Sequence, residues 1–285
     1  MERVAGGEKA GTGPADGWEG TPQPGATARG LRVWRLVGGL VMAVVLVLSG
    51  SQAMGVLVRQ HTVRDKTYAL AARELVLDTT GAEVRIEPGL PGQVLVRSSL
   101  DWTLRKPLVA MIWEGDTLKV SVRCDRMLDL GDLGCGVGLD IRVPAATVVT
   151  GRSTSGSVEV RGLTGDVELR SGSGAVVLRG LGGRVSARSG SGSVRGTALA
   201  SARVEVGTGS GDARLAFARP PDAVTASTSS GELWITVPTG SRYRITGRSA
   251  SGGRSIDPVL EDPGAPRGID VSTGSGAVFI RSSDG

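Results

Sequence analysis

Two glutamates are the best candidates for acid–base chemistry in this 285-residue chain. Glu168 and Glu205 occupy equivalent outward positions two repeat units apart. Two strand spacings put them about 10 Å from each other. That separation lies at the upper edge for the carboxylate pair of an inverting glycosidase. The competing interpretation is a solvated face that keeps the protein soluble, and we favour it. We therefore predict no catalytic residues.

The cysteines and the histidine offer little further chemistry. Cys124 and Cys135 flank a short loop, and such a pair suits a disulfide or two unrelated thiols, whereas a metal site needs two more ligands nearby. The only histidine, His61, stands outside the repeats and is expected on the surface, which excludes a Ser–His nucleophile from the repeats. No glycine-rich segment continues into Gly-Lys-[ST] or carries the aspartates of a calcium-binding repeat. We expect neither a metal nor a cofactor.

Two large aromatic residues fall at outward positions of the repeats. Trp234 and Phe279 belong to a column that begins Glu159, Val177, Arg195 and Arg214. They form a candidate interaction patch for a ligand or partner. The alternative, which we favour, is that the insertion containing Pro258, Pro263 and Pro266 covers them.

A sequence repeat positions these residues. The pattern [ST]-x-S-G occurs seven times, beginning at residues 153, 171, 189, 208, 228, 249 and 273, with 18 to 24 residues between successive glycines. Apolar pairs at alternating positions follow and precede most copies, which predicts two short strands per period with one buried face. Units of this kind, stacked copy on copy, form a β-solenoid of about seven coils.

The corners of the coils have predictable roles. Serine and threonine hydroxyls at equivalent corners are expected to bind backbone groups of the neighbouring coil. The glycines are expected to supply positive φ angles. The last coil, which ends in "AVFIRSSDG", is expected to leave an open edge on which another molecule could stack. Less regular strands in residues 67–150 are expected to cap the other end, with Trp102 and Trp113 in the core of the cap.

The N-terminal part predicts a membrane anchor. The run from Leu36 to Val58 contains no charged residue and is long enough to span a bilayer. A signal peptide cleaved after Ala53 is the alternative, and both interpretations export the rest of the chain. Basic residues on both sides of the run leave its orientation open. A net charge of +5 with both signs mixed along the chain gives no indication of a nucleic-acid partner.

The predicted organisation follows from these features. The segments are a disordered cytoplasmic tail (1–31), a transmembrane helix (32–59), a juxtamembrane linker (60–69) and an extracytoplasmic, adhesin-like β-solenoid domain (70–285). The fold class is therefore all-β after one transmembrane helix. A disulfide between the two cysteines could persist in an extracytoplasmic compartment.

Several segments resemble a known family. "TTGAEVRI", the cysteine-bearing loop, "DIRVPAATVV" and "SGSVEVRGLTGDVEL" are similar to the putative-adhesin β-strand-repeat family of bacterial envelope proteins, a domain of unknown function. The resemblance covers about residues 70–285. It implies an anchored or exported β-solenoid at the bacterial cell membrane, often with such a cysteine pair before the VPA segment, and it supplies no catalytic residues.

We therefore predict a non-enzymatic, membrane-anchored envelope protein whose solenoid is a scaffold or an adhesion module. Its partner, beyond the membrane itself, would be another envelope protein or a surface glycan. One alternative is an accessory component of an envelope-stress signalling system that uses the N-terminal tail as its cytoplasmic contact. The weaker alternative is a polysaccharide-processing enzyme that uses Glu168 and Glu205. The oligomeric state is not predicted.

Overall fold

The computed structural model describes residues 37–46, 60–102, 106–124 and 135–283. The chain divides into two compact units, Met1–Met54 and Gly55–Gly285. In the first unit, residues 37–46 are helical and all exposed. Within the described residues, no helix has the length and apolar character needed to cross a membrane. The predicted tail and most of the predicted transmembrane segment lie outside the described residues.

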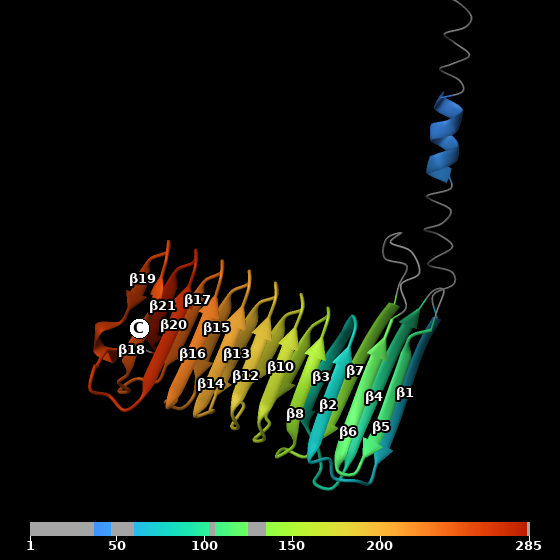
Figure 1. Ribbon diagram of the computed structural model, residues 1–285. Helices are drawn as coiled ribbons and strands as arrows, with labels where there is room; N and C mark the ends of the chain where they lie inside the picture. The colour runs from blue at the N-terminus through green and yellow to red at the C-terminus, as the bar shows by residue number, and fades with distance from the viewer. Residues whose placement is uncertain (1–36, 47–59, 103–105, 125–134, 284–285) are drawn as a thin grey trace, which may run out of the picture. The chain divides into compact units, whose positions relative to one another are not determined.

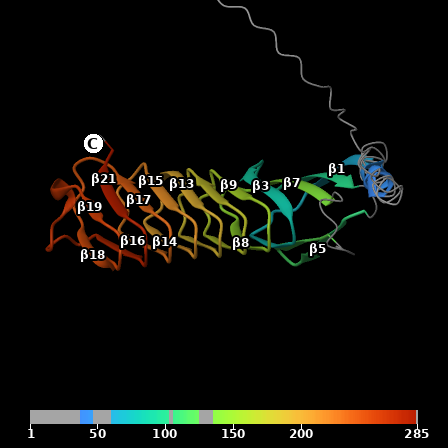
Figure 2. The same cartoon turned by 90° about the horizontal axis from the view of Figure 1, so that it is seen from above.

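The second unit consists of two β-sheets that face each other (Figures 1 and 2). Sheet A contains, in spatial order, β1 (Gln60–Tyr68), β4 (Val94–Trp102), β7 (Cys135–Val143), β3 (Ala82–Pro88), β9 (Val158–Arg161), β11 (Val176–Arg179), β13 (Val194–Leu199), β15 (Ala213–Phe217), β17 (Leu233–Val237), β21 (Val278–Ser282) and β19 (Arg254–Ile256). Sheet B contains β18 (Arg244–Ser249), β20 (Gly268–Thr273), β16 (Ala223–Thr228), β14 (Arg203–Thr208), β12 (Val185–Ser189), β10 (Val167–Ser171), β8 (Val148–Ser153), β2 (Glu74–Thr79), β6 (Thr117–Arg123) and β5 (Leu108–Glu114).

The sequence repeat corresponds to stacked coils with one strand in each sheet. Val176 of β11 pairs in parallel register with Val158 of β9 on one side and Val194 of β13 on the other. These three valines are at most 5% exposed, because each coil buries its alternate residues between the sheets. The all-β, repeat-based fold predicted from the sequence is confirmed.

The first serine or threonine of the motif forms a hydrogen-bonded ladder from coil to coil. The Thr208 hydroxyl donates to the carbonyl oxygen of Gly192 in the preceding coil at 2.9 Å and accepts from the amide of Gly211 at 3.1 Å. Thr228 makes the same two bonds one coil further on. Buried backbone groups at the corners are thereby satisfied, as the sequence predicts.

The prediction about glycine φ angles is wrong for most copies of the motif. Among the [ST]-x-S-G glycines, only Gly156 has a positive φ, of 96°. A Cβ at Gly192 would instead collide with the carbonyl oxygen of Gly174 in the adjacent coil. Close backbone stacking, more than an unusual φ, therefore requires the glycine. Positive φ is found at the opposite corner, where Gly162 has 63° and Gly180 has 58°.

The C-terminal coils do not stack in chain order, so the predicted open last coil is also wrong. The last coil, β20 and β21, lies between β16 and β17 on one side and β18 and β19 on the other. Its inward residues, Ile269, Val271, Val278 and Ile280, are all apolar and at most 1% exposed. The outermost coil has Gly247 paired with Val271 and Arg254 paired with Val278. The less apolar coil occupies the end, where burial is incomplete.

The N-terminal end also departs from the predicted segments. The residues assigned to a linker form β1, which pairs antiparallel with β4 along all nine of its residues. The coil of β2 and β3 lies between β8 and β9 on one side and β6 and β7 on the other, and the antiparallel strands β4, β5 and β1 close the stack. Trp102 and Trp113 are partly buried and pack against the core, as predicted for the cap.

Candidate functional site

The outward face of sheet A aligns one side chain from each strand into a continuous row. In-register pairing gives the order Asp65, Arg97, Asp140, Arg85, Glu159, Val177, Arg195, Arg214, Trp234, Phe279 and Ser255, which we call the sheet A row. Acidic and basic residues alternate in its first five positions. Opposite charges are therefore cross-strand neighbours, which is the favourable arrangement on a sheet.

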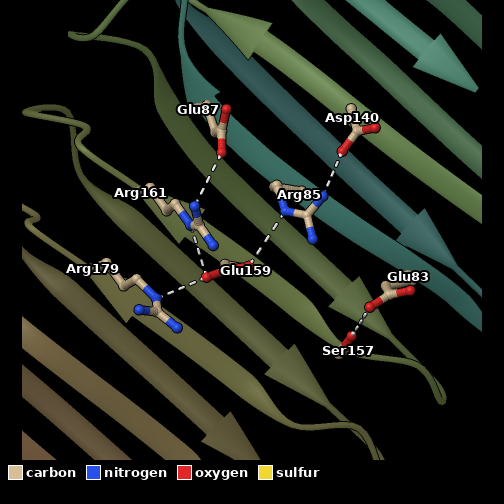
Figure 3. A network of polar contacts seen from close by, with 8 residues as sticks. All are labelled: Glu83, Arg85, Glu87, Asp140, Ser157, Glu159, Arg161 and Arg179. Carbon is tan, nitrogen blue, oxygen red and sulfur yellow. Dashed lines mark hydrogen bonds and ion pairs between the residues drawn. The ribbon is translucent and has the colours of Figure 1, made fainter.

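Glu159, a member of this row, is the centre of an ion-pair network (Figure 3). Its Oε1 accepts hydrogen bonds from Nε of Arg161 and Nε of Arg179, each at 2.8 Å. Its Oε2 accepts from Nε of Arg85 at 3.4 Å. Three strands, β3, β9 and β11, thus position guanidinium groups around one carboxylate that is only 16% exposed. The ion pairs fix these side chains in place, because each arginine has a carboxylate partner on a neighbouring strand.

Further carboxylates bind the Nη1 atoms of two of these arginines. Nη1 of Arg85 donates to Oδ1 of Asp140 at 3.1 Å, and Nη1 of Arg161 lies 3.5 Å from Oε1 of Glu87. Further along the row, Arg97 makes a bidentate pair with Asp65, with both N–O distances at 2.9 Å. A two-point guanidinium–carboxylate contact fixes orientation as well as distance.

The network borders a surface hollow of about 320 Å³. Arg85, Arg97, Arg142 and Arg161 line it together with Glu87 and Asp140. Among the described residues, Arg142 makes no ion pair, whereas the other three arginines are paired with carboxylates. The hollow therefore presents ordered guanidinium groups, one of them free to bind an external acceptor.

The electrostatics of the network favour ionic recognition over acid catalysis. The hydrogen bond from Arg161, opposed by partial burial, lowers the pKa of Glu159 below its usual range. The bond to Glu159 correspondingly raises the pKa of Arg161. A carboxyl whose pKa is lowered stays ionised at neutral pH and is a poor proton donor. The arrangement can bind charged groups but does not suit a general acid.

Glu159→Gln is expected to lower the free energy of unfolding by about 1–2 kcal/mol at pH 7, because three arginines lose a charged acceptor in a partly buried site. The pKa of Glu159 is lower in the folded state, so its contribution is complete above the unfolded pKa, roughly 4.3, and is lost as pH falls through the folded pKa. The stability difference between wild type and variant, measured by urea unfolding, should shrink below about pH 4.

Glu83→Gln is the matched control for this prediction. Glu83 lies on the neighbouring strand β3, is exposed, and accepts only a 3.4 Å hydrogen bond from the Ser157 hydroxyl. We expect little change in unfolding at any pH. Equal losses for the two variants, or a Glu159 effect that does not depend on pH, would contradict the assignment of the network's energy to Glu159.

The predicted aromatic pair lies further along the same row. The rings of Trp234 and Phe279 stack on each other, with centroids 3.9 Å apart and planes inclined by 20°. Nε1 of Trp234 donates to Glu232 at 2.9 Å, and the guanidinium of Arg281 lies 5.8 Å from the Trp234 ring centroid. Both aromatic side chains are half-buried. They extend the charged row with a flat, apolar segment.

The proline-containing insertion lies at the corner between β19 and β20. Its 3₁₀ turn η1 (Pro258–Leu260) buries Leu260, whose carbonyl oxygen accepts a hydrogen bond from the amide of Tyr243 at 2.8 Å. Within the described residues, no hydrogen bond or ring contact joins this insertion to Trp234 or Phe279. Their assignment as an interaction patch stays a prediction.

The other predicted chemical residues are dispersed. On sheet B, Glu168 pairs with Arg170 at 2.8 Å and Glu205 pairs with Arg188. His61 lies on β1 and contacts Asp101 at 2.8 Å. Among the described residues, no group of three or more His, Cys, Asp and Glu side chains could hold a metal. These sites do not converge on one place.

The cysteines are described only in part. Cys124 is disulfide-bonded and follows β6 directly, where it packs against the core. The side chain of Cys135, the first residue of β7, lies outside what the structure describes. The pairing of these two cysteines stays a prediction.

Sequence reasoning missed Arg85, Arg97 and Asp140 in the charged part of the sheet A row. They come from β3, β4 and β7, which lie outside the [ST]-x-S-G repeat and follow the order β4, β7, β3 in the sheet, so strands that pair are not consecutive in the chain. The only indication in the sequence was the alternation of charged and apolar residues within each strand. That alternation shows which residues face outward but not which strands pair.

The C-terminal half of the chain matches a known protein family. A family model described as Toastrack DUF4097 matches residues 138–281, about half of the chain. A putative adhesin of Bacteroides fragilis is 14% identical with a TM-score of 0.49, and the match covers 78% of this chain and 97% of that one. A putative adhesin of Parabacteroides distasonis is also 14% identical, with a TM-score of 0.41 and the same coverage. No curated protein matches the chain.

Proposed function

The chain belongs to the Toastrack DUF4097 family, and on that basis we propose that it is a membrane-anchored interaction module of the cell envelope. The observation that carries this proposal is the sheet A row, where neighbouring strands hold charged and aromatic side chains in a fixed array. Such an array suits recognition of a partner surface, because its side chains are ordered before binding. The partner would be another envelope protein or a surface glycan.

The exposed apolar helix supports the anchor. Large apolar side chains in residues 37–46, among them Val37, Leu40 and Met42, are 49% to 67% exposed. A helix that is apolar on all sides is stable only inside a protein core or a membrane. These residues lie within the uncharged run from Leu36 to Val58, so we assign the run as a single-pass anchor with residues 60–285 outside the cytoplasm.

The pairing of the carboxylates supports a binding role over a catalytic one. Glu159, Glu168 and Glu205 are each held by at least one arginine. A hydrolase of the paired-carboxylate type needs one carboxyl with a raised pKa. Glu159 has the opposite shift, and its role in binding follows from the guanidinium groups that it orders.

Site-specific photo-crosslinking in intact cells tests this function. A photoreactive residue replaces Arg195, on the outward face of sheet A, or Ser186, on the outward face of sheet B in the same coil. We expect a discrete crosslinked species from position 195 and not from position 186, and we expect Trp234→Ala to weaken it. No crosslink at either position, or equal crosslinks at both, would count against sheet A as the interaction face.

Membrane fractionation tests the anchor separately. The full chain should stay in the membrane pellet after extraction with alkaline carbonate, whereas a chain lacking residues 36–58 should not. Recovery of the full chain in the soluble fraction would contradict the anchor without bearing on the crosslinking result.

A further inference from the structure

The two sheets leave a hollow between their edge strands at the N-terminal end. It has a volume of about 300 Å³ and is lined by β1 and β4 of sheet A and by β5 of sheet B. Three cations, Arg64, Lys66 and Lys106, lie around three apolar side chains, Leu100, Val109 and Met111. We call this hollow the basic mouth. Its size is at the lower end of the range for small-molecule sites.

Two of the cations point toward the core side of the sheet. Arg64 pairs with Ser98 and Lys66 pairs with Val96 in the antiparallel ladder, and directly paired residues lie on the same face. Ser98 and Val96 are at most 4% exposed, so theirs is the core face. Arg64 and Lys66 therefore occupy positions that apolar residues fill elsewhere in sheet A.

The basic mouth lacks compensating negative charge. No aspartate or glutamate is among its described lining residues, and within the described part of the chain Arg64, Lys66 and Lys106 make no ion pair. Lys106 is held by the Trp102 ring, with Nζ 5.3 Å from the ring centroid. On the outward face of sheet A, Arg85, Arg97 and Arg161 have carboxylate partners, whereas Arg142 and Arg195 have none within the described residues. Three uncompensated cations around an apolar floor match an anionic group attached to a hydrocarbon.

We propose that the basic mouth binds the phosphate headgroup of an anionic membrane lipid. This inference rests on the proposed anchor, because only Arg59 separates the end of the uncharged run at Val58 from the start of β1 at Gln60. The guanidinium of Arg64 can donate two hydrogen bonds to phosphate, and the two lysines add positive charge. Leu100, Val109 and Met111 receive the apolar part of the lipid next to the headgroup. The exposed Leu108 at the rim is suited to the same interface.

Inward charges on an edge strand have a second known role, which is to prevent pairing with other chains. Edge protection requires no ligand and does not explain the third cation, Lys106, which lies outside β1. Lipid binding predicts a dependence on headgroup charge that edge protection does not. The two explanations therefore differ in a measurable way.

The test uses the full-length chain in dodecyl maltoside micelles. Dihexanoyl phosphatidylglycerol, an anionic lipid, is titrated against dihexanoyl phosphatidylcholine, and bound lipid is counted by native mass spectrometry. The variant is R64Q/K66Q, and the matched control is R152Q/R203Q. Arg152 and Arg203 are exposed on the outward face of sheet B, away from the sheet A row, so the control makes the same change in net charge elsewhere.

We expect one phosphatidylglycerol to bind the wild type and the control with equal affinity. Each cation near an anionic lipid is worth about fivefold in affinity, so R64Q/K66Q should bind on the order of 25-fold more weakly. Equal binding of the two lipids, equal affinity of the variant and the control, or full competition by inorganic phosphate at equal concentration would overturn the proposal. Retention of the full chain in carbonate-washed membranes is scored separately, so failure of the anchor and failure of the basic mouth remain distinguishable.

Discussion

Replacing Gly192 by alanine is expected to lower the free energy of unfolding by about 3 kcal/mol, the upper part of the usual range for overpacking. The methyl group would collide with the carbonyl oxygen of Gly174, a backbone atom that cannot rotate away. For a unit of this size, the loss corresponds to a fall in melting temperature of roughly 6–12 °C. Circular dichroism during thermal unfolding measures it.

Gly182→Ala is the control for this prediction. Gly182 belongs to the opposite corner of a neighbouring coil, and its φ is not positive. Its nearest neighbour would lie 3.6 Å from a new Cβ, an ordinary van der Waals contact. This variant should be neutral or slightly stabilised, because alanine restricts the unfolded chain. Equal destabilisation of both variants would show that loss of glycine flexibility, and not backbone stacking, limits stability.

The repeated part of the fold could be predicted from the sequence because its contacts are local and periodic. Each strand pairs with the strand one period away, so the spacing of [ST]-x-S-G identifies both the strands and their register. Val158, Val176 and Val194 are paired as the repeat predicts. The outward column from Glu159 to Trp234 follows from the same register. Phe279 lies next to Trp234 because β21, and not β19, pairs with β17.

The order of the terminal coils was not predicted, although part of the information was present. A coil between two other coils buries more of its apolar surface than a coil at the end of the stack. The coil with the more apolar inward residues is therefore favoured at the inner position. Ile269 and Val271 in the last coil are more apolar than Ile245 and Gly247 in the preceding one. Comparing the coils by their inward residues, instead of assuming chain order, would have placed β20 and β21 inside.

The basic mouth and the Glu159 network could not be predicted from the repeat period or from a comparison of the coils. Both depend on β1, β3, β4 and β7, whose partners are distant in sequence and follow no period. Arg64 and Lys66 look like ordinary surface residues in a charged segment. Only the pairing of β1 with β4 shows that they occupy inward positions.

Replacing both Cys124 and Cys135 by serine is expected to lower the free energy of unfolding by about 3 kcal/mol, because a disulfide between them would close a short loop and restrict the unfolded chain. In the folded chain it would join the end of β6 in sheet B to the start of β7 in sheet A. The backbone amide of Cys124 also donates to the Thr80 hydroxyl at 3.2 Å, which fixes this end of the connection to the neighbouring coil. Denaturant unfolding of the double variant, compared with oxidised and reduced wild type, measures the effect. Reduced wild type should match the variant.

The same cysteines test the proposed compartment, because a structural disulfide persists outside the cytoplasm and is rare within it. In intact cells, the thiols of the full chain should resist a maleimide reagent until a reductant is added. A chain lacking residues 36–58 should stay in the cytoplasm, and its thiols should react after lysis without reduction. It should also unfold at the lower midpoint of the double variant, since the cross-link never forms. Free thiols in the full chain as isolated from membranes would contradict both the disulfide and the extracytoplasmic assignment of residues 60–285.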